Sequence, residues 1–105
     1  MKNATQVLAE KRDAVASLCR RVRVRRLDAF GSVVRQDFDA ERSDLDFVVE
    51  FDDMPPLQYS NAFFELKEGL EALFSRPVDL VVEGAIRNPH FRSRVQAERQ
   101  PVYAG

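Results

Sequence analysis

Three aspartates interrupt segments that otherwise have the composition of apolar strands. Asp44 and Asp46 are separated by one residue at the start of the apolar run 45–51, and Asp79 interrupts the run 78–82. Because alternate side chains of a strand point to the same face, Asp44 and Asp46 should share one face. Two carboxylates at that separation repel each other and are costly to desolvate unless a cation lies between them. The pattern therefore predicts a divalent metal site.

Asp79 completes this site if strand 78–82 lies beside strand 45–51, because the three side chains then form an oxygen-only set of ligands. Such a set favours Mg²⁺ or Mn²⁺ over zinc, and Mg²⁺ is commonly bound by a few carboxylates together with substrate phosphate oxygens. Taken singly, Asp-x-Asp at a strand start is also typical of a solvated strand end. A calcium loop beginning at Asp37 is excluded, because Arg42 and Val48 occupy the positions that need Gly and Glu.

A Gly-Ser pair precedes the carboxylates in the chain. Gly31 permits a close approach of the backbone, and the Ser32 hydroxyl and the amides that follow can hold phosphate oxygens. An ordinary turn is the alternative interpretation of Gly-Ser alone. Together with the aspartates, the pair predicts a phosphate-binding turn beside a metal site, and the acidic segment 37–41 is interpreted as a solvated loop between them.

The elements that must position these residues follow from apolar periodicity. A repeat of three and four predicts helices over 4–19, 58–74 and 89–98, the last with Asn88 as its cap and Pro89 at its first position. Period-two alternation and β-branched runs predict strands over 21–30, 45–51 and 78–82, and residues 101–103 are expected to be extended. This order predicts an α/β-type or α+β fold in which helices cover a small sheet.

Composition limits the class of protein. The chain has 105 residues, of which 45% are hydrophobic and 31% charged, which predicts one globular domain over 1–105 and argues against disorder. No apolar run approaches the roughly 18 residues of a membrane span, so a cytoplasmic location is expected. The single cysteine, Cys19, cannot form an internal disulfide or a zinc cluster and is expected in the core.

The charges are unevenly distributed around a net charge of −1. Residues 1–35 carry nine Lys or Arg against three Asp or Glu, residues 36–83 carry three against thirteen, and residues 84–105 carry four against one. The arginines of segment 20–26 leave a nucleic-acid surface open as an alternative. The acidic centre would repel a polyanion, however, and the segment lacks interleaved aromatic residues, so a solvated or partner-facing strand edge is favoured.

Taken together, these motifs resemble the signature of the DNA polymerase β-like nucleotidyltransferase superfamily. Its three parts correspond to Gly31-Ser32, Asp44-Leu45-Asp46 and Val78-Asp79-Leu80-Val81. The length of the chain and the segments 87–89 and 101–103 are more narrowly similar to the minimal nucleotidyltransferase (MNT) proteins. The spacer 33–43 is one residue longer than is usual in the family, and Gln36 stands where members often have Gly.

The resemblance implies a small mixed β-sheet flanked by helices, the polymerase β-like fold. It implies transfer of a nucleoside monophosphate, AMP from ATP, to an acceptor hydroxyl with release of pyrophosphate. Asp44 and Asp46 would then hold Mg²⁺ against the triphosphate, and Asp79 would bind a second ion or help to deprotonate the acceptor. The implied nucleotide-binding residues are Gly31, Ser32 and Arg35.

The family also implies a partner, because MNT proteins commonly act as antitoxins of HEPN-domain toxins. The expected function is therefore nucleotidylation of such a toxin, with ATP as the nucleotide substrate. A binding-only antitoxin, or a non-catalytic subunit with a vestigial site, remains the alternative. Retention of all three aspartates argues against it, because an inactive site has no need to hold mutually repelling carboxylates.

Overall fold

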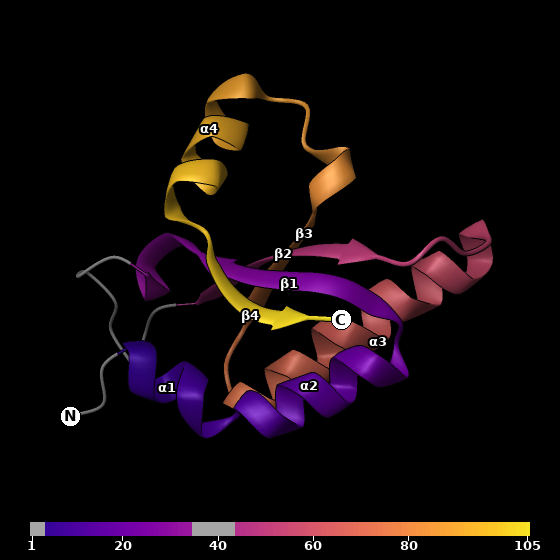
Figure 1. The fold of residues 1–105 in the computed structure, drawn as a ribbon, viewed down its shortest axis with the longest axis horizontal. Helices are drawn as coiled ribbons and strands as arrows, with labels where there is room; N and C mark the ends of the chain where they lie inside the picture. The colour runs from indigo at the N-terminus through magenta and orange to yellow at the C-terminus, as the bar shows by residue number, and fades with distance from the viewer. Residues whose placement is uncertain (1–3, 35–43) are drawn as a thin grey trace.

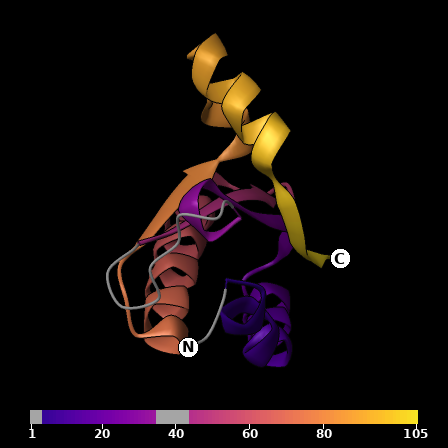
Figure 2. The same cartoon turned by 90° about the vertical axis from the view of Figure 1, so that its left-hand side faces the viewer.

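The computed structural model describes residues 4–34 and 44–105, and the side chains from Gln6 onward within those ranges. Arg35 therefore lies outside the described residues. The described elements form a four-stranded sheet with helices on both faces (Figures 1 and 2). In chain order they are α1 (Ala4–Glu10), α2 (Arg12–Arg21), β1 (Val24–Phe30), η1 (Gly31–Val33), β2 (Leu45–Phe51), α3 (Pro56–Phe74), β3 (Val78–Val82), η2 (Glu83–Ala85), α4 (Pro89–Glu98) and β4 (Gln100–Ala104).

The sheet is mixed, as the resemblance implied. Its strand order is β3-β2-β1-β4, with β2 parallel to β3 and β1 antiparallel to both β2 and β4. The expected mixed α/β fold is thereby confirmed. The parallel pairing puts Asp46 opposite Asp79, and the antiparallel pairing puts Phe30, the residue before the Gly-Ser pair, opposite Asp46.

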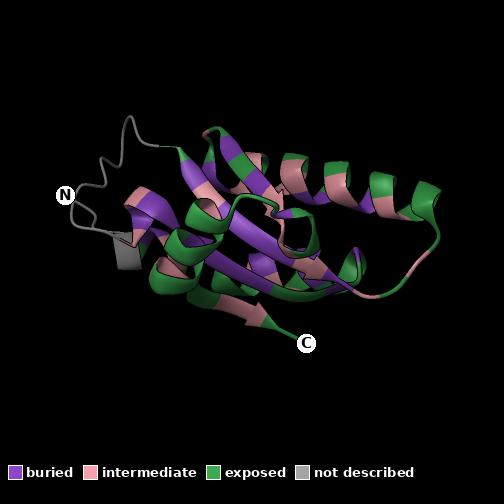
Figure 3. Cartoon of the chain, turned by 90° about the horizontal axis from the view of Figure 1, so that it is seen from above, coloured by how far each residue is buried: buried purple, intermediate pink, exposed green. Residues whose placement is uncertain are grey.

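The larger core lies between the sheet and the layer formed by α1, α2 and α3 (Figure 3). On β2, Leu45, Phe47 and Val49 point into this core and are fully buried. The side chains that alternate with them point to the opposite face. That face therefore carries Asp46 and Val48, as the alternation of a strand requires.

Helix α4 lies on the opposite side of the sheet from α1, α2 and α3, and it rises away from the sheet (Figures 1 and 2). Its cap is as expected, because the Asn88 side chain accepts hydrogen bonds from the backbone N–H groups of His90 and Phe91, at 2.8 and 3.1 Å. A second, smaller core anchors the helix to the sheet, in which Val95 is buried with residues of β1, β2 and the segment before α4: Phe30, Val48 and Ile86. This helix consequently lies on the face that carries Asp46.

The N-terminal helix differs from the prediction, because residues 4–19 form two helices separated at Lys11 instead of one. The apolar stripe is nevertheless used on both sides of the break, since Val7 from α1 and Val15 and Leu18 from α2 are all buried in one core. The break gives the two short helices separate directions while each buries its own apolar side chains. The periodicity was therefore informative about burial but not about continuity.

The first strand is shorter than predicted, since 21–30 contains the end of α2 and a turn before β1 begins at Val24. Arg23 has a left-handed backbone with φ of 62°, which reverses the chain between helix and strand. The alternation of arginine and valine at 21–25 resembles a strand pattern but spans this turn. Helix α3 also begins two residues before the predicted start, at Pro56.

Two further expectations concern burial. Cys19 is buried in the core, where desolvation raises the pKa of its thiol to about 12, so it packs as an apolar residue and is not a nucleophile. Within the described part of the chain, no helix combines the length and apolar character needed to cross a membrane.

Candidate active site

Two of the predicted metal-binding aspartates lie side by side. Asp46 on β2 and Asp79 on β3 are register partners in a parallel pair, and Asp44 precedes β2 as an exposed residue. The pKa of Asp46 is raised from 3.8 to about 6, first by burial, then by the charge of Asp79 and a hydrogen bond with it, and finally by the charge of Asp44. All three carboxylates therefore interact electrostatically, with Asp46 at the centre.

The Gly-Ser turn lies directly against Asp46. Gly31 has a left-handed backbone with φ of 76°, and a Cβ atom added to it would lie 2.1 Å from the Asp46 Oδ2. No residue with a side chain fits there without displacing the carboxylate. Ser32 follows as a half-buried residue of η1, so the structure brings the predicted turn and the predicted carboxylates together.

Helix α4 contributes two residues to the site that the motifs did not indicate. The Gly31 backbone N–H donates a hydrogen bond to the Glu98 Oε1 at 3.0 Å, and the Arg94 Nε lies 3.7 Å from the same oxygen. The positive charge of Arg94 lowers the pKa of Asp46, opposing the effects that raise it. In the sequence, Arg94 and Glu98 have the four-residue spacing of an ordinary surface ion pair, and only the placement of α4 on the sheet reveals their position.

A buried ionic network lies beside the site and was not predicted. Asp28 on β1 is completely buried, and its Oδ2 accepts a hydrogen bond from the Arg99 Nε at 2.6 Å. Arg99 also donates to the Glu83 Oε1 at 2.6 Å, and Arg26 lies 3.0 Å from the Asp28 Oδ2. The hydrogen bond from Arg99 lowers the pKa of Glu83. The network joins β1, η2 and the end of α4.

The donor set fits a hard divalent cation. Among residues 4–34 and 44–105, no group of three or more His, Cys, Asp or Glu side chains is assembled as a ready-made cation site. The adjacent Asp46 and Asp79 instead provide two carboxylates, of which Asp46 has a raised proton affinity, next to an exposed Asp44. Mg²⁺ is typically bound by one or two carboxylates while substrate phosphates complete its coordination. The arrangement suits that mode better than a closed protein cage.

Three arginines of the arginine-rich segment have acidic partners. Arg21 pairs with Glu65 at 3.3 Å, and Arg25 pairs with Asp52 at 3.4 Å and with Glu50 at 3.7 Å. Arg26 is engaged by Asp28 in the buried network. These acidic partners offset the positive charges that phosphate groups would need, which disfavours the nucleic-acid interpretation.

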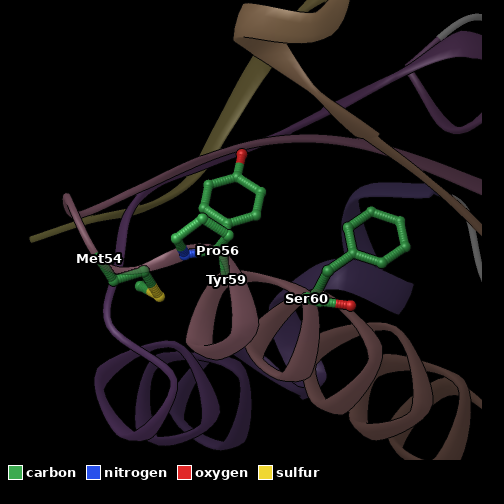
Figure 4. A pocket seen from close by; sticks show the side chains of 5 residues that line it. Met54, Pro56, Tyr59 and Ser60 are labelled. Carbon is green, nitrogen blue, oxygen red and sulfur yellow. The ribbon is translucent and has the colours of Figure 1, made fainter.

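A pocket of about 480 Å³ lies at the start of α3 (Figure 4). It is lined by Met54, Pro56, Tyr59, Ser60 and Phe63. None of the motif residues lines it, and its helix belongs to the layer on the other side of the sheet from α4. The pocket is therefore separate from the carboxylates.

A family model described as the nucleotidyltransferase domain matches residues 11–102. The chain belongs to this nucleotidyltransferase family. The match spans both parts of the site, the whole of β1, β2 and β3, and the beginning of β4. It confirms the resemblance that the Gly-Ser and aspartate motifs indicated.

Two relatives of this chain are named as protein adenylyltransferases. A Methanocaldococcus jannaschii protein, provisionally named as a protein adenylyltransferase, is 33% identical to this nucleotidyltransferase over 98 residues, covering 93% of this chain and 96% of the relative. Protein adenylyltransferase MntA of Thermococcus cleftensis is 42% identical over 65 residues, covering 62% of each chain.

Solved structures share the fold. One provisionally described as a minimal nucleotidyltransferase is 36% identical with a TM-score of 0.71, and the match covers 95% of this chain and 96% of the other. A structure of a tri-AMPylated Shewanella oneidensis HEPN toxin in complex with an MNT antitoxin also matches. Its identity is 19%, its TM-score is 0.63, and the match covers 93% of this chain and 73% of the other.

Proposed function

We propose that the protein is a Mg²⁺-dependent adenylyltransferase that transfers AMP from ATP to a hydroxyl group of a HEPN-type toxin and thereby acts as its antitoxin. The observation that carries the proposal is the packing of Gly31 against Asp46, whose register partner is Asp79. Relatives named as protein adenylyltransferases support the type of reaction. The complex of a HEPN toxin with an MNT antitoxin suggests the class of partner.

The aspartates have distinct proposed roles. Asp44 and Asp46 would hold Mg²⁺ against the triphosphate, while Asp79 would bind a second ion or accept the proton of the attacking hydroxyl. The bound cation would offset charge on the phosphates. Because Asp46 and Asp79 share a hydrogen bond and repel each other when both are ionised, the pair has a strong affinity for positive charge.

The turn would orient the nucleotide. The Ser32 hydroxyl would donate to outer phosphate oxygens, and Arg35, which lies outside the described residues, is proposed to assist. Gly31 would allow the turn to lie against Asp46, because it places no side chain between the backbone and that carboxylate. These contacts would position the α-phosphorus in line with the acceptor.

In the proposed transfer, the acceptor oxygen forms a bond to the α-phosphorus while the bond from that phosphorus to the oxygen bridging to the β-phosphorus breaks. Pyrophosphate leaves with the electron pair of that bond, and the hydroxyl proton passes to Asp79 or to solvent. The product carries AMP in a phosphodiester linkage. Catalysis depends on positioning and charge neutralisation, and the requirement for ATP supports a cytoplasmic location.

A neutralisation experiment separates catalysis from binding. The protein is co-expressed with a candidate HEPN-type partner toxin, and growth is compared for wild type, Asp46→Asn, Asp79→Asn and the control Asp13→Asn, an exposed residue of α2. We expect wild type and the control to restore growth. The site variants should fail to do so while still co-purifying with the toxin. Restoration of growth by both site variants would instead support a binding-only antitoxin.

A further inference from the structure

We propose that α4 supplies part of the nucleotide site, with Arg94 binding a phosphate oxygen of the nucleoside triphosphate and Glu98 positioning both Arg94 and the Gly31 turn. The inference rests on the proposed function and identifies an additional cationic contact for the same substrate. It assigns roles to two residues that lie outside the Gly-Ser and aspartate motifs.

One face of α4 holds all the relevant side chains. Phe91, Arg94, Val95 and Glu98 are spaced by three, one and three residues, so they lie along one stripe of the helix. Val95 is buried in the smaller core, and Phe91 packs edge-on against Phe30 with ring centroids 5.8 Å apart. The apolar members of the stripe therefore fix Arg94 and Glu98 on the sheet-facing side of α4.

Glu98 links this helix to the turn. Its carboxylate accepts the Gly31 N–H at 3.0 Å, and only 17% of its side chain is exposed. A charged acceptor strengthens such a hydrogen bond, which restrains the left-handed Gly31 in the conformation that abuts Asp46. The Gly31 amide is thus used to hold the turn, and the Val34 N–H donates to the Gly31 carbonyl oxygen at 3.1 Å. The Ser32 hydroxyl is the group of the turn that would contact phosphate.

Arg94 is oriented but accessible. Its guanidinium carbon lies 5.6 Å from the centroid of the Phe91 ring, and its Nε lies 3.7 Å from the Glu98 Oε1, yet 51% of the side chain is exposed. Through Glu98, whose Oε1 also accepts the Gly31 N–H at 3.0 Å, Arg94 lies beside the turn that abuts Asp46. A guanidinium held this way, beside the carboxylates, matches the geometry and charge of a phosphate group.

Ion pairs of Arg99 hold the end of α4 that carries Arg94 and Glu98. Arg99, the residue after Glu98, is 10% exposed and is held by Asp28 and Glu83, at 2.6 Å in each case. The end of α4 is therefore fixed to β1 and η2. Glu98 is positioned over Gly31 by this anchor and by the buried Val95.

Nucleotide binding tests the role of Arg94 independently of transfer. Calorimetry with Mg²⁺ and a non-hydrolysable ATP analogue is applied to wild type, Arg94→Gln, Arg94→Lys and Arg12→Gln, which removes the same charge from an exposed position on α2. We expect Arg94→Gln to weaken binding by at least about tenfold, Arg94→Lys to weaken it less, and Arg12→Gln to stay within about twofold of wild type.

Two outcomes of this binding experiment contradict the role of Arg94 in different ways. Equal affinities for Arg94→Gln and Arg12→Gln would overturn it while leaving the proposed function intact. Absence of binding to the wild-type protein itself would overturn both. A thermal unfolding scan of each variant confirms that the comparison is between folded proteins.

If Glu98 positions the Gly31 turn, substitutions of Glu98 should change the nucleotide affinity in a defined direction. Glu98→Gln keeps an oxygen that can accept the Gly31 N–H, so we expect affinity within about threefold of wild type. Glu98→Ala removes that acceptor and should weaken binding by about tenfold, although it also removes a negative charge near the triphosphate. Tighter binding by Glu98→Ala would mean that the carboxylate competes with phosphate, and would overturn the positioning role.

Discussion

At the scale of single residues, Gly31 makes the most stringent demand on the sequence. Its φ is 76°, and a Cβ atom at this position would lie 2.1 Å from the Asp46 Oδ2. Both features require glycine. We expect Gly31→Ala to destabilise the protein by about 1–3 kcal/mol and to abolish transfer, because the carboxylate must move. Urea unfolding and a transfer assay test this. Gly84→Ala is the matched control, since nothing lies within 4 Å of its added Cβ, and an equal effect of both substitutions would contradict the prediction.

Asp46 should cost the folded protein stability at neutral pH. Its pKa is raised to about 6 in the folded state, so the folded protein binds the proton more tightly than the unfolded chain does. The penalty is absent below about pH 4, grows between about pH 4 and 6, and is complete above about pH 6. After allowance for solvent screening we expect Asp46→Asn to stabilise the protein by about 1 kcal/mol at about pH 8 and by much less at about pH 4. Urea unfolding at both pH values checks this, and a less stable variant at the higher pH would contradict it.

The sequence was informative about residues whose chemistry conflicts with their surroundings. Asp46 and Asp79 stand out because a carboxylate is unexpected in an apolar strand, and the structure places them in register. Arg94 and Glu98 gave no such signal, because a charged pair at a spacing of four is ordinary on a helix surface. Their position beside Gly31 depends on where α4 packs, which local sequence does not specify.

At the scale of elements, Gly69 sets the approach of α2 to α3. A Cβ at this position would lie 2.7 Å from the Leu18 Cδ2, inside the core. Gly69→Ala should therefore destabilise the protein by about 1 kcal/mol, since the overpacking exceeds the gain in helix propensity. In a Leu18→Ala background the same substitution should be stabilising, because the clash is gone. Free energies of unfolding for the four proteins of this cycle test the prediction, which fails if the sign does not change.

The observed ends of helices and strands agree with the ends predicted from the apolar pattern where an element buries a single face. Strands β2 and β3 and helix α4 have the predicted limits, since each is bounded by residues that cannot continue it or by a cap such as Asn88. The break at Lys11 and the turn at Arg23 were not predicted, because the burial pattern continues across both. Packing against the sheet, not local propensity, determines where these elements stop.

At the scale of the whole molecule, the Asp28–Arg99 pair connects segments that are far apart in the chain. Asp28 is fully buried and Arg99 is 10% exposed, so removing Asp28 takes away one of the two carboxylates that hold Arg99 and leaves Glu83 as the other. We expect Asp28→Ala to destabilise the protein by about 2–3 kcal/mol, and the double variant with Arg99→Met to recover part of that loss. Denaturant unfolding measures both, and additive losses in the double variant would show that the two side chains do not act as a pair.

The strand order of the sheet could not be predicted from local sequence, because it depends on how distant segments of the chain pack. The composition of 101–103 indicated an extended segment, but its pairing with β1 depends on the chain returning from α4 to the edge of the sheet (Figure 1). The sequence indicated that β2 and β3 are neighbours only through the chemistry, since their pairing is what gathers the aspartates. The fold meets that condition, and it adds Arg94 and Glu98 from the C-terminal segment.

Transfer of label tests the central claim most directly. The purified protein is incubated with Mg²⁺, the candidate HEPN-type partner protein, and ATP labelled at either the α- or the γ-phosphate. We predict that α-label becomes covalently attached to the partner, that γ-label does not, and that Asp46→Asn prevents the attachment while Asp13→Asn does not. Attachment of γ-label, or a stable complex with no attached label, would contradict adenylyl transfer.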